Sequence, residues 1–509
     1  MGKITYLLII LFGLTAGIAS RHLAFDDDEF QHAHMACLLA RGDVPHRDFF
    51  EHHLPLYHFL LAPLTLGEPG PERILALRGF SVLIAMVTLL AMARAIRVWS
   101  GHDSPAVLAL LAFSPIFFVK MIEVRPEGFC LLLACTALVF LKNSKRNFLS
   151  GLLSGAMVMG SQKFVFLAAG LFLLAWREHG FKNLVKFCGG GIVFPLLIGI
   201  YFLFTGALPQ AFQDLVRINL AWKESFSPAM YGVLLWSTSA LLISSGVLGL
   251  FSDREKSSRR AVLFLLLSGV AAVMLVPIPF RQTFLMLYPG LTLGAALCWQ
   301  QFAESLEQPK QKFVAGGCLC LFALLPAATN LQKEFQASPT ADLDLMRQMD
   351  QRGTGPIFDG RRLLFYRDHV GHYPWMHQGL MLMLDPEEHA LQTKTAIIEM
   401  NYPDVLWDYR VDMMSPLLHN FLQAHYVPVT PPSLWVPGKT IDRSRLRTGT
   451  EITLPVEGDY IVSWQGGSVF INQQEVHSGG RIHLNTDPIT VKGNGFIREF
   501  KIHHAGGSK

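Results

Sequence analysis

The chain has 509 residues, of which 51% are hydrophobic and only 16% are charged. Soluble domains carry about 25% charged residues, so this composition excludes an ordinary soluble protein and indicates a polytopic membrane protein. The formal net charge of +4 is small, and the sequence has no basic stretch interleaved with aromatic residues, so nucleic acid is not an expected partner. Most of the seven cysteines lie in apolar runs, so neither disulfides nor thiolate metal sites are expected to organise the fold.

Apolar runs recur along the first two thirds of the chain. A membrane-spanning helix needs about 20 apolar residues, and about eleven runs approach that length, although the fourth to sixth are short. The first run follows Lys3 and ends in AGIAS, so a cleaved signal peptide is an alternative reading of it. The expected transmembrane runs are residues 4–20, 74–99, 105–119, 128–141, 148–159, 164–176, 185–204, 232–251, 261–276, 284–299 and 313–328.

Basic residues predict the orientation of these helices, because cytoplasmic loops of membrane proteins are enriched in lysine and arginine. With the N-terminus in the cytoplasm, the inner loops contain ARAIRVW, KNSKR, WREHGFKNLVK, DREKSSRR and EQPKQK. The short outer turns then contain only Lys120, Arg125, Lys163 and Arg281. We therefore expect a cytoplasmic N-terminus and a C-terminal region on the outer side.

The outer turns combine cations with polar or acidic neighbours, in KMIEVRPEG, GSQKF and PIPFRQTFLMLYPG. Charged residues at membrane depth usually face a cavity or a partner. Cations and acids that recur on one side therefore predict one polar cavity at the outer membrane face. Two residues are expected to lie elsewhere: Lys120 extends to the lipid headgroups, and Tyr288 is an interfacial aromatic residue.

The first outer loop, residues 21–73, is dense in acids and histidines, as in FDDDEFQHAHMACLLARGDVPHRDFFEHHLPLYHF. Residues 30–40 and 56–66 have apolar residues at helical spacing, which predicts two interfacial helices along the outer leaflet. The second long outer segment, residues 205–231, is amphipathic and is expected to form a flap over bound substrates.

These motifs, in this order, resemble the GT-C superfamily of membrane glycosyltransferases, and within it the protein O-mannosyltransferases and the bacterial aminoarabinose transferase of lipid A. The pair Asp28-Glu29 matches the acidic pair in the first loop of the family. FFEHHLPL matches the family's FDVHPPL, which puts Glu51 on its second acid and His53 on its histidine. The chain departs from the pattern by a glutamate for an aspartate and by Leu54 for the first proline. The resemblance covers roughly residues 1–300.

The resemblance implies an enzyme that transfers a sugar from a polyprenyl-phosphate donor to an acceptor at the outer face of the membrane. A carboxylate is a suitable base for the acceptor's proton, and cations stabilise a phosphate leaving group. The implied base is Asp28; Asp26, Asp27, Glu29, Asp48 and Glu51 are alternatives, as is a solvated helix N-terminus without a catalytic role. Arg125 is expected to pair with Glu127 or Glu51. The expected site comprises the catalytic residues Asp28 and Glu51, the supporting residues Glu29, Asp48, His53, Arg125 and Glu127, and the phosphate-binding residues Lys163, Arg281 and Gln282.

No cofactor and no metal are expected. The alternative is a divalent cation bound by His32 with His34 or by His52 with His53, but His52 and His53 are expected to be hydrogen-bonding walls of the cleft. The expected partners are a polyprenyl-phosphate sugar, membrane lipids and an acceptor that could be a lipid, a glycan or a protein. The resemblance implies a bacterial inner membrane, with a periplasmic C-terminal region.

Other functions remain as alternatives. A transporter or flippase for a lipid-linked sugar would need polar residues in the middle of its helices, whereas the expected spans are almost purely apolar there. A transferase of whole oligosaccharides would share the same loop chemistry.

The composition becomes that of a soluble protein after about residue 330. Residues 331–440 mix helical and strand patterns, which predicts a small α/β region. Residues 441–509 alternate in short strands with glycine turns, as in GDYIVSWQGGSVFINQQEVHSGGRIHL, which predicts a β-sandwich-like module. The expected domains are thus a transmembrane domain of residues 1–330 and these two regions.

Overall fold

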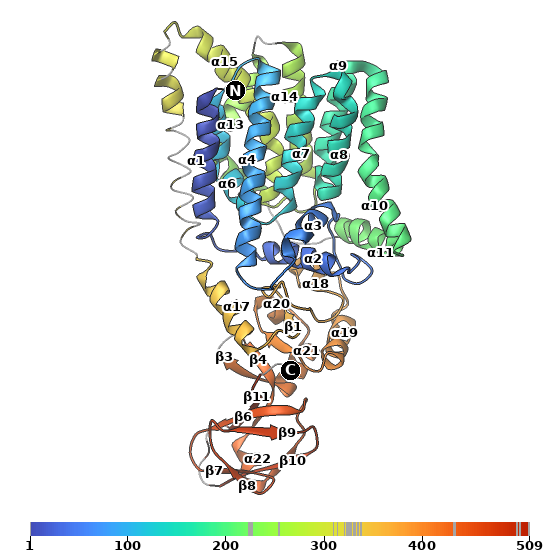
Figure 1. Ribbon diagram of the computed structural model, residues 1–509, viewed down its shortest axis with the longest axis vertical. Coiled ribbons are helices and arrows are strands. Elements are labelled where there is room, and N and C mark those ends of the chain that lie inside the picture. Colours follow the sequence, from blue (N-terminus) through green and yellow to red (C-terminus); the bar gives the residue numbers. More distant parts are fainter. Residues whose placement is uncertain are drawn as a thin grey trace. The chain divides into compact units, whose positions relative to one another are not determined.

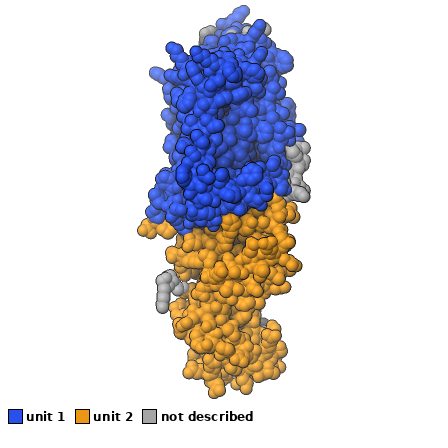
Figure 2. Space-filling model, turned by 90° about the vertical axis from the view of Figure 1, so that its right-hand side faces the viewer, with its two compact units in different colours: residues 1–67, 72–341 blue, residues 68–71, 342–509 orange. Residues whose placement is uncertain are grey.

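The computed structural model of the protein describes residues 2–221, 228–252, 255–308, 338–430 and 434–494, together with 310–312, 314–319, 321, 328, 332, 335, 497 and 500–506. The chain divides into two compact units (Figure 2). One comprises residues 1–67 and 72–341, and the other comprises residues 68–71 and 342–509. The boundary near residue 341 lies close to the change in composition.

The first unit is helical. Its helices are α1 Lys3–Ala19, α2 Asp27–Arg41, α3 Leu56–Leu61, η1 Ala62–Thr65, α4 Arg73–Ser100, α5 Pro105–Ala112, α6 Pro115–Ile122, α7 Pro126–Leu141, η2 Ser144–Arg146, α8 Asn147–Gly160, η3 Gln162–Phe164, α9 Val165–Gly191, α10 Val193–Phe204, α11 Leu208–Phe212, the π-helix η4 Gln213–Ile218, α12 Asn219–Ala221, α13 Pro228–Leu248, η5 Gly249–Phe251, α14 Lys256–Leu275, η6 Arg281–Leu287 and α15 Tyr288–Ser305.

Three helical stretches in the described part of the chain are long and apolar enough to cross a membrane, and they make the protein an integral membrane protein. They are Arg73–Ser100, Gln162–Phe204 and Lys256–Leu275; α5 and α6, bent by 65°, would form a fourth. The expected count of about eleven spans is not confirmed. The first ten expected runs do fall on helices, but several, such as α7 with 16 residues and α8 with 14, are shorter than a full span. Half of the eleventh run lies outside the described residues.

Glycines allow helices of this bundle to approach closely. A Cβ atom added at Gly155 of α8 would lie 2.2 Å from the backbone oxygen of Gly191, at the end of α9. One added at Gly190 would lie 2.1 Å from the backbone oxygen of Phe148. Tyr288 was expected at the membrane interface, but it is buried in this core and its hydroxyl contacts the hydroxyl of Ser114 at 2.6 Å. A buried phenol needs such a hydrogen-bond partner.

The first loop contains the two expected helices, as α2 and as α3 continued by η1. Both lie across one end of the bundle (Figure 1). Residues 29–38 of α2 are all buried, so α2 is not the half-exposed interfacial helix that its spacing predicted. Its polar side chains can be buried because they pair with polar residues of neighbouring elements. Gly42, with a φ of 99°, ends the helix in the left-handed conformation.

The second unit contains a seven-stranded sheet in the order β1-β2-β4-β11-β6-β9, with β3 also on β4, and a four-stranded sheet in the order β5-β10-β7-β8. The expected boundary at residue 440 falls inside β4, which pairs with β11. Both sheets contribute to one core, for example through Val462 and Val491, as in a sandwich. The elements are α17 Thr340–Arg352, β1 Ile357–Asp359, α18 Gln378–Met381, α19 Pro386–Glu399, β2 Asp404–Leu406, α20 Tyr409–Asp412, α21 Pro416–His425, β3 Tyr426–Thr430, β4 Leu434–Ile441, α22 Arg443–Thr448, β5 Thr450–Ile452, β6 Gly458–Trp464, β7 Ser468–Ile471, β8 Gln474–Val476, β9 Arg481–Leu484, β10 Ile489–Asn494 and β11 Phe500–His504.

Candidate active site

The start of helix α2 is fixed by a capping box and a buried ion pair. Asp26 accepts a hydrogen bond from the backbone amide of Asp28 at 3.1 Å, and Glu29 accepts one from the amide of Asp26 at 3.0 Å. This reciprocal capping defines the first helical turn. Glu29 also accepts two hydrogen bonds from Arg78 of α4, at 2.7 and 2.6 Å. Both side chains of this pair are fully buried, so the pair anchors the acidic end of α2 to the bundle.

Arg125, the residue before α7, gathers three carboxylates. Its guanidinium lies 2.6 Å from Asp26, 2.8 Å from Asp28 and 2.5 Å from Glu123. Lys120 at the end of α6 joins the same group, at 3.2 Å from Asp26 and 2.8 Å from Glu123. Two cations and three acids from α2, α6 and the turn before α7 therefore form one ionic network.

Two sequence expectations about these cations are wrong. Lys120 does not extend toward lipid headgroups, because it is buried and paired with two acids. The ion pairs of Arg125 are with the three acids of this network rather than with Glu127 or Glu51. The reason is the crossing of α2 over the end of the bundle, which brings its first turn onto α6; loop sequence alone does not reveal such a crossing.

Asp26 and Asp28, at the start of α2, both pair with Arg125 and are both partly exposed. Burial raises the pKa of Asp26, but the charges of Arg125 and Lys120 outweigh burial and lower the pKa to about 2. Asp26 is therefore ionised at physiological pH and holds the two cations. Asp28 also pairs with Arg125, and 30% of its side chain is exposed, close to the 35% of Asp26, so a substrate can reach either carboxylate.

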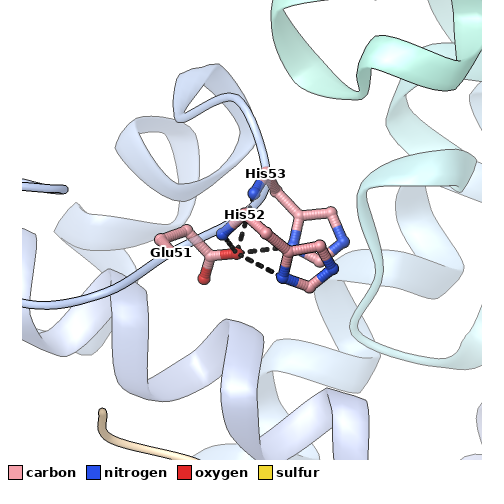
Figure 3. Close-up of side chains that lie close together, drawn as sticks. All are labelled: Glu51, His52 and His53. Atoms are coloured by element: carbon pink, nitrogen blue, oxygen red, sulfur yellow. Dashed lines mark hydrogen bonds and ion pairs between the residues drawn. The ribbon is translucent and has the colours of Figure 1, made fainter. Parts of the chain in front are cut away.

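Glu51 is the centre of a second polar group, beside α2. Its Oε1 oxygen accepts hydrogen bonds from the backbone amides of His52 and His53, both at 2.9 Å, and from the His53 ring at 2.6 Å. Gln31 of α2 lies 3.4 Å from both carboxylate oxygens. The two imidazole rings lie on the same side of the carboxylate (Figure 3). The Oε1 oxygen of the buried Glu51 is thus already occupied by three N–H groups.

The buried histidines around Glu51 are neutral. His32 of α2 contacts His58 of α3 through ring nitrogens 3.0 Å apart, and the centroids of the His32 and His53 rings are 5.0 Å apart. Burial and the charge of Lys163 lower the pKa of His53 to about 3. Burial lowers the pKa of His58 to about 4, although Glu51 opposes this shift. Burial and its neighbours also lower the pKa of His32 well below 6.5.

One group of residues has the composition of a metal site. Ligand atoms of Glu51, His52 and His53 lie within 4.8 Å of one another, and carboxylate with imidazole suits zinc and similar cations. However, the Oε1 oxygen of Glu51 already accepts three N–H hydrogen bonds. A cation bound at Oε1 would have to displace them, whereas the Oε2 oxygen has a contact with Gln31 at 3.4 Å.

The expected phosphate ligands Lys163 and Arg281 lie beside different acids. Lys163 in η3 lies 3.9 Å from Glu127 in the first turn of α7, and its charge acts on His53. Arg281 lines a cavity of about 130 Å³ together with Asp26, Lys120, Glu123 and Arg78, among others. Gln282 is buried next to Arg281 in η6. Asp26, Lys120 and Glu123, all members of the ionic network of Arg125, thus line the cavity of Arg281. Arg125 also interacts electrostatically with Glu127.

Asp48 lies in a turn beside these groups. It accepts a hydrogen bond from the backbone amide of Val44 at 2.7 Å and pairs with Arg47, which is largely exposed, at 2.8 Å. These contacts stabilise the turn. Sequence reasoning missed Arg78 as the partner of Glu29, because Arg78 lies inside an apolar run; a charged residue at that depth is itself a signal of a buried partner.

The expected flap segment is tied to the first loop where the structure describes it. His46, with a φ of 70°, lies 3.0 Å from Asp214 of the π-helix η4, and both side chains are fully buried. The backbone oxygen of His52 accepts hydrogen bonds from Asn219 at 2.9 Å and from Gln162 at 2.7 Å. Residues 222–227 of the expected flap lie outside the described residues.

Comparison with protein-family models and with curated proteins found no match. Comparison with solved structures found ArnT from Cupriavidus metallidurans, whose apo structure matches with a TM-score of 0.57 at 14% identity, over 84% of this chain and 97% of ArnT. ArnT bound to undecaprenyl phosphate matches with a TM-score of 0.54 at 12% identity, over the same shares. AftD from Mycobacteria, an arabinofuranosyltransferase, gives a TM-score of 0.49 at 14% identity, over 96% of this chain and 40% of AftD. Because ArnT is a GT-C glycosyltransferase, the chain has the GT-C fold that the motifs of its first loop predicted.

Proposed function

We propose that this protein is a membrane glycosyltransferase that transfers a sugar from a polyprenyl-phosphate donor to an acceptor hydroxyl at the outer, periplasmic face of a bacterial inner membrane. The observation that carries the proposal is the meeting of Asp28, a carboxylate that is 30% exposed, with the buried Arg125 in one ionic network. The described structure of ArnT with undecaprenyl phosphate supports a lipid-phosphate donor.

The chemistry assigned to these residues is a substitution at the anomeric carbon. The acceptor oxygen attacks that carbon and its proton passes to Asp28, while the bond to the phosphate oxygen breaks and the phosphate leaves with the electron pair. Arg125 and Lys163 stabilise the charge that develops on the phosphate, as preorganised cations do in a site that excludes water. Arg281 and Gln282 are proposed to contact the same phosphate from η6.

Glu51 is proposed to position the site rather than to take the proton. Its Oε1 oxygen accepts three hydrogen bonds, and only 1% of its side chain is exposed. It fixes His53, and through Gln31 it fixes the loop against α2, whose first turn carries Asp28. Glu29 anchors the same turn through Arg78.

The test follows release of undecaprenyl phosphate, the product common to every acceptor. Purified protein in liposomes is given undecaprenyl-phosphate glucose, mannose and arabinose in turn, with an extract of bacterial envelope as the source of acceptors. We expect Asp28→Asn to lower the release about 100-fold or more, since loss of a general base costs about 10²–10⁴. Asp27→Asn, with the same charge change one residue away, should keep most of the rate.

Two results would contradict the proposal. One is wild-type protein that releases no undecaprenyl phosphate above protein-free liposomes with any of the three donors. The other is transport of the intact donor across the bilayer without its cleavage, which would indicate a flippase. If Asp27→Asn abolishes release and Asp28→Asn does not, the base has been assigned to the wrong aspartate.

A further inference from the structure

Glu127 carries a carboxylate oxygen that no hydrogen bond satisfies within the described part of the chain. It lies in the first turn of α7, and its side chain is 2% exposed. Its Oε1 oxygen lies 3.9 Å from the Nζ atom of Lys163, whereas its Oε2 oxygen is buried and accepts no hydrogen bond from any described residue. A buried acceptor of this kind is unfavourable, and more so when it is charged.

The turn that carries Lys163 contributes two more such atoms. The hydroxyl of Ser161 and the side-chain oxygen of Gln162 are buried and lack a hydrogen-bond partner among the described residues. This turn packs tightly against α7, since a Cβ atom added at Gly160 would lie 2.7 Å from the sulfur of Cys130. The side-chain nitrogen of Gln162 is fixed by the backbone oxygen of His52 at 2.7 Å.

These three acceptors lie beside the cation to which we assign the donor phosphate. Their shared need is for hydrogen-bond donors, and a sugar ring supplies several hydroxyl groups. In a sugar phosphate, the sugar ring is attached directly to the phosphate. The ring hydroxyl nearest to the phosphate is the one on the carbon next to the anomeric carbon. Hydrogen bonds that this hydroxyl donates to carboxylates strengthen in transition states with oxocarbenium character.

We propose that Glu127 and Ser161 bind the hydroxyl next to the anomeric carbon of the donor sugar, and thereby select donors that carry a free hydroxyl at that position. This inference rests on the proposed function, because it uses Lys163 as a ligand of the donor phosphate. Glu127 is then a specificity residue, distinct from its expected role as a partner of Arg125.

The test compares how tightly the full-length protein in detergent binds lipid phosphate without a sugar and lipid phosphate that carries a sugar. The probes are undecaprenyl phosphate, the same lipid carrying glucose, mannose or arabinose, and the lipid carrying 2-deoxyglucose. The variants are Glu127→Gln and Ser161→Ala, with the exposed Glu475→Gln of the second unit as a matched control. Binding is followed by the ligand-induced rise in thermal midpoint and by titration.

In the wild-type protein, at least one sugar-bearing lipid should bind more tightly than undecaprenyl phosphate. Glu127→Gln should weaken that lipid about 10-fold or more, as expected for loss of a hydrogen bond to a charged group, and Ser161→Ala about 3-fold to 10-fold. Both variants should leave undecaprenyl phosphate within about 2-fold of wild type. The lipid with 2-deoxyglucose should bind about equally to wild type and to Glu127→Gln.

The inference is overturned if Glu127→Gln weakens undecaprenyl phosphate and the sugar lipids equally, since Glu127 would then act only by holding Lys163. It is also overturned if no sugar adds affinity, or if the deoxy sugar is weakened as much as its parent. Two other results would contradict the proposed function itself. In one, the wild-type protein binds none of the lipids; in the other, Lys163→Met leaves the affinity for every lipid unchanged.

Discussion

The ion pair of Glu29 and Arg78 should contribute more to the free energy of unfolding than any exposed ion pair in the helical unit. Both side chains are fully buried, and Glu29 also accepts hydrogen bonds from the amides of Asp26 at 3.0 Å and Val124 at 3.1 Å. In Glu29→Gln the shape is kept but the charge is lost. Arg78 still donates to three backbone oxygens of residues 20–24, so its charge stays buried without a counterion.

The magnitude follows from that geometry. Breaking a buried ion pair by neutralising one partner costs about 3–5 kcal/mol, and two charge-assisted hydrogen bonds at about 1.5–3 kcal/mol each give a similar sum. Thermal unfolding in detergent at a fixed scan rate should therefore show a midpoint lower by several degrees. The matched control is Glu255→Gln, whose partner Lys142 lies 3.2 Å away and whose side chain is 66% exposed; such pairs contribute about 0–1 kcal/mol. Equal midpoints for Glu29→Gln and Glu255→Gln would refute the reasoning.

Three further changes test other parts of the structure. Acidification from pH 6.5 toward pH 4 should lower the thermal midpoint. The unfolded chain protonates its histidines near pH 6.5, whereas the folded state keeps His53 and His58 neutral down to pKa values of about 3 and 4. A midpoint that does not depend on pH in this window, or a pH dependence of the midpoint that His58→Gln leaves unchanged, would contradict this. Gly190→Ala should destabilise the bundle by about 1–3 kcal/mol through overpacking, since its Cβ would lie 2.1 Å from the backbone oxygen of Phe148. The control is the neighbouring Gly189→Ala, whose Cβ would meet nothing within 4 Å. Equal unfolding of the two variants would argue against close packing of α8 on α9. Glu51→Gln should slow donor cleavage about 10-fold to 100-fold by releasing His53 and should shift the pH profile, while a wild-type rate would show that the group does not position the site.

The fold could be predicted from sequence where local patterns decide it. Long apolar runs mark helices, and the order of short motifs in the first loop indicated the GT-C fold that comparison with ArnT confirmed. The count of spans could not be derived in the same way. The 65° bend between α5 and α6 divides the expected run 105–119 at a place that hydropathy does not mark.

The candidate site was predictable in composition but not in pairing. The sequence identifies Asp28, Glu51, Arg125 and Lys163 as unusual residues, because charge at membrane depth needs a partner. Which residues pair depends on how α2 crosses the end of the bundle, and neither the spacing nor the motif encodes that crossing. For the same reason the expected interfacial character of α2 was wrong, since its polar face is covered by partners from α3 and α4.

Asp28 and Glu51 are physically unequal, and this inequality supports the different roles proposed for them. A base must lie within reach of the proton that it removes. Glu51 has an oxygen that accepts three N–H groups and a side chain that is almost fully buried, whereas Asp28 has 30% of its side chain exposed. A donor phosphate drawn to Arg125 would also compete with Asp28 for that cation. Donor binding would then weaken the ion pair between Asp28 and Arg125.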